Sequence, residues 1–169
     1  MTPGRYGRTM QITRSGRFVF VAQWVAAFVL PLFVIIGRGL IGSPLGWMMV
    51  IGIWFGLLGV VAMYIPPILT LFDGEVRRQR ATRRAYTIST WVVWIALLVL
   101  AITIVDGGDS GGVGSALTVW TGDAVSDDVS NGIALVALLV AFVALAAACV
   151  LAIVGIVRSA KSSRTAAHA

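Results

Sequence analysis

Residues 133–157 read IALVALLVAFVALAAACVLAIVGIV, and this stretch decides the fold. It is 25 residues long and contains no charged residue, no Asn, no Gln and no Pro. A membrane-spanning helix needs about 20 mainly apolar residues, because each residue advances it by about 1.5 Å across a hydrocarbon core about 30 Å thick. We therefore expect a transmembrane helix over these residues.

Three other apolar runs are about 20 residues long, at residues 18–37, 45–65 and 87–105. None of the four runs contains Asp, Glu, Lys, Arg or His. Hydrophobic residues make up 59% of the chain and charged residues 12%, which is half of the roughly 25% found in soluble domains. The alternating pattern of barrel strands is absent. The sequence predicts an all-α integral membrane protein with four transmembrane helices in one domain, residues 18–157.

Basic and acidic residues fall on opposite sides of the predicted spans. The tail 1–17, the loop 73–86 and the tail 158–169 together carry a net charge of +10. The two other loops carry a net charge of −4, most of it in the Gly-rich segment 106–132. Because Lys and Arg are enriched in cytoplasmic loops, we expect both termini and the Arg-rich loop to be cytoplasmic.

The composition also bears on source and partners. Twelve arginines stand against one lysine, among many Ala, Val and Gly residues, which is typical of GC-rich bacterial genomes. We therefore expect a multi-pass protein of the bacterial plasma (inner) membrane. The arginines lie where a membrane topology requires them, so the pI of 10.7 does not indicate nucleic acid as a partner. The expected partners are anionic lipid head groups and other membrane proteins or further copies of the chain.

Two prolines, Pro66 and Pro67, directly follow the predicted second span. Proline removes a backbone donor and disfavours helix in the preceding residue, so the helix should break or kink near Ile65. Either a new helix begins at Pro67 and lies at the interface, or one kinked helix continues into the cytoplasm. The loop that follows supplies five candidates for contact with lipid head groups or a partner: Arg77, Arg78, Arg80, Arg83 and Arg84.

Small residues recur at helical spacing in two of the predicted spans. Small side chains let helix backbones approach closely in lipid, and steps of three and four residues keep them on one helix face. The candidates for helix packing are Gly52, Gly56 and Gly59 in the second span, and Ala137, Ala141, Ala144, Ala148, Ala152 and Gly155 in the fourth. The sequence leaves open whether these faces pack within the chain or on a partner.

Two short motifs look catalytic. Residues 108–112 read GDSGG, which resembles the nucleophile segment of trypsin-like serine proteases, and residues 165–168 read TAAH, which resembles their histidine segment. Ser110 and His168 would have to lie within hydrogen-bond reach, but the predicted topology separates them by about 30 Å of hydrocarbon. The outer aspartates follow no calcium-loop spacing, although cation binding by their loop stays open. We expect no catalytic residue, cofactor or metal site.

The predicted spans contain no ionisable residue, and Gln23 is their strongest polar group. Because ionisable residues inside the membrane mark ion and proton pathways, proton-coupled transport by this chain alone is not expected. The leading hypothesis is a non-enzymatic structural or accessory subunit that binds membrane partners and anionic lipid. The alternatives are a homo-oligomeric pore or transporter element and, third, a lipid-modifying or redox membrane enzyme.

Overall fold

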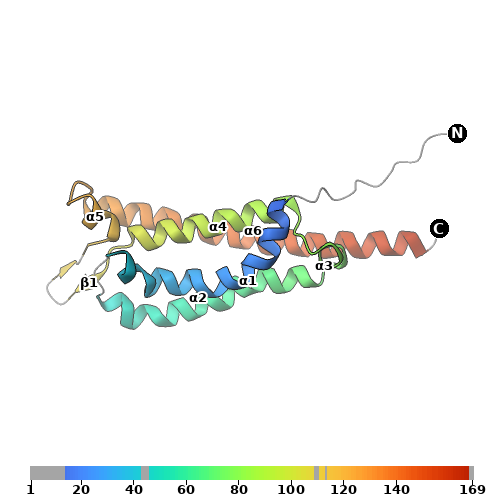
Figure 1. Cartoon of the computed structure of the whole chain (residues 1–169), viewed down its shortest axis with the longest axis horizontal. Coiled ribbons are helices and arrows are strands. Elements are labelled where there is room, and N and C mark those ends of the chain that lie inside the picture. Colours follow the sequence, from blue (N-terminus) through green and yellow to red (C-terminus); the bar gives the residue numbers. More distant parts are fainter. Residues whose placement is uncertain (1–13, 43–45, 109–110, 113, 168–169) are drawn as a thin grey trace.

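The computed structural model is a bundle of four long helices that lie side by side along its longest axis (Figure 1). It describes residues 14–42, 46–108, 111–112 and 114–167. The long helices are α1 (Arg14–Ile35), α2 (Trp47–Leu71), α4 (Arg84–Thr103) and α6 (Asp127–Ala167). Each contains a segment long and apolar enough to cross a membrane. The prediction of a mainly helical chain with four helices of spanning length is therefore confirmed.

Short elements connect the long helices at the two ends of the bundle. The 3-10 helix η1 (Gly37–Ile41) follows α1, and α5 (Ala116–Trp120) precedes α6. Between α4 and α5, two-residue strands β1 (Gly107–Gly108) and β2 (Gly111–Gly112) pair antiparallel. At the opposite end of the bundle, α3 (Gly74–Gln79) links α2 to α4 (Figure 1).

Helix α6 is longer than the apolar run that predicts it. It begins at Asp127, ahead of Ile133, and continues to Ala167, through most of the predicted tail. Asp127 and Asp128 lie in its first turn, where carboxylates interact favourably with the positive end of the helix dipole. Its 41 residues correspond to about 60 Å of helix, so its last turns project beyond the bundle (Figure 1).

Helix α2 runs through Pro66 and Pro67 and ends at Leu71, so of the break or kink expected near Ile65 the break does not occur. The helix does not continue into the Arg-rich loop either. Both prolines lie beside a buried cavity lined by α1, α4 and α6, and the Thr70 hydroxyl donates to the Pro67 carbonyl at 2.7 Å. The chain therefore keeps helix geometry at both prolines, although each lacks the backbone donor of a helix interior.

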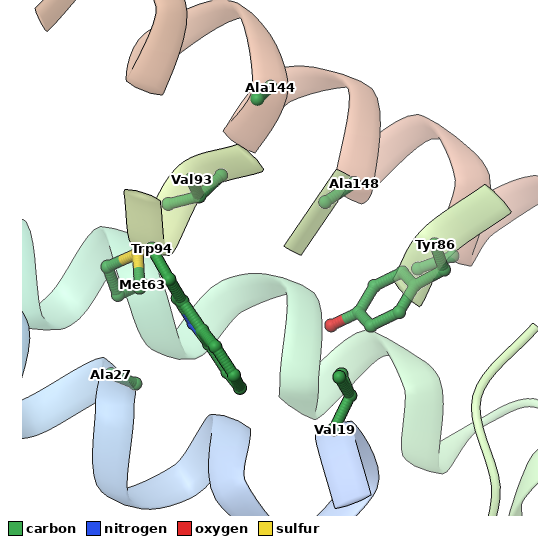
Figure 2. Close-up of a cluster of buried hydrophobic side chains, with 9 residues drawn as sticks. Val19, Ala27, Met63, Tyr86, Val93, Trp94, Ala144 and Ala148 are labelled. Atoms are coloured by element: carbon green, nitrogen blue, oxygen red, sulfur yellow. The ribbon is translucent and has the colours of Figure 1, made fainter. Parts of the chain in front are cut away.

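The core lies mainly between α4 and α6. Val93 and Trp94 of α4 pack with Ala144 and Ala148 of α6, and Met63 of α2 closes the cluster (Figure 2). A second cluster lies nearer the chain's acidic loops and contains Val34, Ile35, Leu100, Ala101, Ala134 and Ala137. Because α6 presents mostly alanines to these clusters, its backbone comes close to α4 and its larger side chains point outward.

The small-residue stripe of α6 is buried inside the chain. Its members, each buried, are Ala137, Ala141, Ala144, Ala148, Ala152 and Gly155. Ala137, Ala144, Ala148 and Ala152 belong to the two clusters that α6 shares with α4, while Gly155 meets the loop between α2 and α4. The question that the sequence left open therefore has an answer for this face, which packs within the chain.

The glycines of α2 pack on α1. A Cβ atom built on Gly52 or Gly56 would lie 3.2 or 3.1 Å from side-chain carbons of Ile35, and one on Gly59 would lie 3.1 Å from the Cβ of Pro31. These distances are shorter than ordinary side-chain contacts, so glycine allows the two helices to approach. This face also lies against a neighbouring helix of the same chain.

Candidate functional site

The two ends of the bundle carry opposite charge. At the basic end, α1 and α4 begin, α2 finishes, and α3 brings further arginines. At the acidic end lie η1, the paired strands and α5, with the aspartates of the loops around them (Figure 1). The charged clusters at these ends and a small cavity between them, next to a few polar side chains, are the candidate sites.

At the basic end, Asp73 forms the centre of a charged cluster. Arg83 donates from Nε to the Asp73 carboxylate at 2.9 Å, and the hydroxyl of Ser159 on α6 donates to the same carboxylate. Asp73 also caps α3 by accepting from the backbone N–H groups of Glu75 and Val76. The cluster ties three segments together: the end of α2, the start of α4 and α6.

Close approach of α6 makes this cluster possible. A Cβ atom on Gly155 would lie 2.6 Å from the Asp73 carboxylate and 3.2 Å from Nε of Arg83. Any side chain at this position would therefore displace the ion pair. Gly155 has a role that the sequence pattern did not reveal, because it accommodates a charged pair instead of another helix.

The electrostatics of Asp73 follow from its surroundings. Its side chain is 2% exposed, and burial by itself would raise the pKa of this carboxyl. Hydrogen bonds from Arg83 and Ser159, the charge of Arg83 and the backbone N–H of Glu75 outweigh burial and lower the pKa below its usual value. Asp73 is therefore held as a carboxylate and serves to fix the loop.

The five arginines of the predicted contact surface do not behave alike. Arg83 turns inward to Asp73 and has a side chain 25% exposed. The four others are exposed: Arg77, Arg78, Arg80 and Arg84. Arg80 ends α3 with a left-handed backbone, φ 50°, so the chain turns back toward α4 at this residue. Four of the five guanidinium groups are therefore exposed, and the fifth is engaged in the ion pair with Asp73.

The loop before α4 also holds the start of α1. The backbone N–H and the hydroxyl of Thr82 both donate to the Gly16 carbonyl, each at 3.1 Å. The Thr82 and Thr87 hydroxyls lie 2.8 Å apart and form a further hydrogen bond. These buried contacts fix the first turns of α1 and α4 against each other at the basic end.

The acidic end contains a second ion pair, and it is fully buried. Nη2 of Arg38 lies 2.9 Å from Oδ2 of Asp106, and both side chains are 0% exposed. Arg38 also donates to the carbonyl of Ile104, while Asp106 accepts from the backbone N–H groups of Gly46 and Gly107. This pair joins the turn after α1 to the end of α4 and the start of α2.

A chain of buried hydroxyl groups lies beside that ion pair. Ser115 and Ser130 are joined by an Oγ–Oγ hydrogen bond of 2.7 Å, and Ser130 donates to the Thr103 carbonyl. Thr118 bonds Ser115 and donates to the carboxylate of Asp127 at 2.9 Å. These bonds fix α5 against α4 and α6, so the groups serve the fold at this end.

Gln23 lies in the core. Its side chain accepts from the Tyr86 hydroxyl at 2.9 Å and donates to the Phe20 carbonyl at 3.2 Å. Gln23 is 2% exposed, so it does not line an open path through a single copy of the bundle. The strongest polar group of the predicted spans thus joins α1 to α4 inside the bundle.

A small cavity lies next to this hydrogen bond. Its volume is about 20 Å³, and its lining includes Gln23, Thr90, Trp94 and the two prolines of α2. The Nε1 atom of Trp94 is buried and has no hydrogen-bond partner in the structure. A volume of about 10–15 Å³ is enough for one water molecule. The cavity can therefore hold a single water near polar groups, but no larger molecule.

Several residues of the sequence-based interpretation lie outside the described residues. They include Asp109, Ser110 and His168, on which the resemblance to serine proteases rests. Within the described ranges, no group of three or more His, Cys, Asp or Glu residues could hold a metal ion.

Comparison with known proteins yields no relative. No family model, no curated protein and no solved structure matches the chain. The interpretation of the chain therefore rests on its own residues and geometry.

Sequence reasoning missed the buried pair at the acidic end. Arg38 is the single basic residue between the predicted first and second spans, and Asp106 is the first residue after the third. A lone arginine and an aspartate that follow two spans on the same side of the membrane could have suggested an ion pair. The signal is weak because 68 positions separate the two residues.

Proposed function

We propose that the chain is a small non-enzymatic subunit of a bacterial plasma (inner) membrane, with a structural or accessory role toward other membrane proteins. Both termini lie in the cytoplasm, and the exposed arginines of the basic end contact anionic head groups. The net charges of +10 and −4 on the two sides support this orientation through the positive-inside tendency.

The observation that carries the proposal is the aromatic face that α2 leaves uncovered. Trp54 is 70% exposed and Phe55 is 67% exposed. Of the four candidate spans, α2 has the smallest buried share, 22% of its most apolar window.

The depth of Trp54 favours a protein contact over a role at the membrane surface. Tryptophan in membrane proteins gathers at the water interface, but Trp54 lies seven residues into α2, about 10 Å along the helix. Large aromatic side chains are also enriched where protein interfaces bind most strongly. A second protein packed on this face would cover both aromatic rings.

The polar groups of the bundle support a structural role. Both ion pairs connect helix ends: Arg38 with Asp106 at the acidic end, and Arg83 with Asp73 at the basic end. Each carboxylate accepts backbone N–H groups besides its arginine, so its oxygens are already engaged. A subunit that holds a fixed shape for its partners needs such contacts.

The test is purification of the tagged chain from its native membrane in mild detergent. We expect an unlike membrane protein to co-purify in fixed stoichiometry, and Phe55→Ala to remove it. Phe142→Ala is the matched control, because Phe142 is 71% exposed on α6 and its loss should leave the complex intact.

Two results would contradict the proposal. A wild-type chain that purifies only with itself and conducts ions in planar bilayers would contradict the accessory role and favour a homo-oligomeric pore. Equal loss of the partner in the two phenylalanine variants would contradict the assignment of the face to α2.

A further inference from the structure

A groove of about 390 Å³ lies between α1 and α4 on the side of the bundle. Its walls are entirely apolar and include Ala22, Ala26 and Val29 of α1 and Trp91, Ile95 and Leu98 of α4. From Trp91 to Leu98 it follows about 10 Å of helix. In a bilayer such a groove is in contact with hydrocarbon, so its occupant must be apolar over this length.

Two arginines continue the faces that line this groove. On α4, Arg84 precedes Trp91 by seven residues, which is close to two full turns and keeps both on one face. On α1, Arg14 precedes Ala22 by eight residues and lies toward the same side. Both arginines are exposed at the basic end, about 10–12 Å along their helices from the groove.

The two helices are held in this relation by an aromatic contact. The ring of Phe18 on α1 stacks on Trp91 with a centroid distance of 5.9 Å and an interplanar angle of 13°. Both helices also begin at this end, so their partially positive N-termini face the same region as the two guanidinium groups. The result is an apolar groove with concentrated positive charge beyond one end.

We propose that this groove binds one acyl chain of an anionic phospholipid whose phosphate is held by Arg14 and Arg84. A phosphate at the arginines lies about 10–12 Å from the groove along the helices, a distance that the head-group layer of about 5–8 Å and the first carbons of the acyl chain span together. A helix of a partner protein would fill the groove but would leave the two charges unmatched. This inference rests on the proposed function and its membrane orientation. It names the class of lipid that the chain binds and the place where that lipid is bound.

The experiment is native mass spectrometry of the full-length chain in mild detergent, titrated separately with dioleoylphosphatidylglycerol and dioleoylphosphatidylcholine. We expect one phosphatidylglycerol to bind about 25-fold more tightly than phosphatidylcholine, because each basic residue near an anionic lipid contributes about fivefold in affinity. The double variant Arg14→Gln/Arg84→Gln should remove this preference. The double variant Arg158→Gln/Lys161→Gln removes two exposed charges of α6, away from the groove, and should keep it.

A second pair of variants tests the groove itself. Ala26→Phe places a ring in the groove and should reduce binding of both lipids at least tenfold, whereas Ala146→Phe adds the same ring to an exposed position of α6 and should not.

Equal binding of the two lipids by the wild-type chain would overturn the proposal, as would equal effects of the two charge variants. If Ala26→Phe releases a co-purified protein while phosphatidylglycerol stays bound, the groove receives a helix instead. If the wild-type chain binds both lipids equally but still co-purifies with a protein partner, the lipid proposal fails and the proposed accessory role stands.

Discussion

Alanine at Gly155 and at Gly132 should shift stability in opposite directions, although both residues lie on α6. At Gly155 the new Cβ would lie 2.6 Å from the Asp73 carboxylate, which cannot move freely because Arg83, Ser159 and two backbone N–H groups hold it. At Gly132 the new Cβ meets nothing within 4 Å. The two substitutions are chemically identical, so their difference isolates the contact.

The magnitudes follow from two opposing effects. Alanine is favoured over glycine inside a helix by about 1 kcal/mol, and this gain applies at both sites. At Gly155, displacement of a charged hydrogen bond costs about 1.5–3 kcal/mol, so the net loss is about 0.5–2 kcal/mol. For a chain of this size, 1 kcal/mol moves the melting temperature by about 2–4 °C. We expect Gly155→Ala to melt about 1–8 °C lower and Gly132→Ala about 2–4 °C higher.

Thermal unfolding in one detergent, followed by tryptophan fluorescence, measures both shifts. A double-mutant cycle with Asp73→Ala adds a direct check, because much of the cost at Gly155 should disappear once the carboxylate is gone. Stabilisation of similar size by both glycine substitutions would refute the close approach of α6 to the charged cluster.

Three further predictions concern other contacts. Asp106→Ala leaves Arg38 buried without its carboxylate, so it should lower the free energy of unfolding by about 3–5 kcal/mol, measured by thermal unfolding. Arg38→Met added to the same chain should recover part of this loss, and no recovery at all would contradict the buried ion pair. Because the folded-state pKa of Asp73 is lowered, its stabilisation is present above about pH 4 and is lost as the pH falls further; melting curves from pH 7 to pH 3 should show this loss, and Asp73→Asn should flatten it. Ala148→Leu should destabilise the chain by about 1–3 kcal/mol through overpacking, while Val150→Leu, at a 59% exposed position, should not; equal melting temperatures would contradict the packing of the stripe.

The number and type of the long helices follow from the sequence because an apolar run of about 20 residues has few alternatives in lipid. Their ends are less predictable. Asp127 and the residues after Val157 are polar, yet α6 includes them, since a helix can extend into water when its terminal charges suit the dipole. Pro66 and Pro67 indicate an interruption locally, yet α2 includes both prolines and ends four residues later.

The sites show the same limit. The spacing of the alanines on α6 indicates a packing face, but spacing alone does not distinguish α4 from a partner protein. The sequence predicts the Arg-rich loop as a contact surface, which stays a prediction. The inward turn of Arg83 could not be predicted, because it depends on where three separate segments bring Asp73 and Ser159. The Arg38–Asp106 pair likewise requires the tertiary fold, because no local rule links residues so distant in the chain.

Labelling of single cysteines on intact bacterial cells tests the central claim of a membrane bundle with its basic end in the cytoplasm. In a Cys149→Ala background, Ala124→Cys places a thiol at an exposed position of the acidic end, and Ala160→Cys places one at an exposed position of α6 beyond the basic end. With a membrane-impermeant maleimide, the residue-124 thiol should react on intact cells and the residue-160 thiol only after the membrane is permeabilised. Reaction of both thiols on intact cells, or of the residue-160 thiol alone, would contradict the proposed orientation.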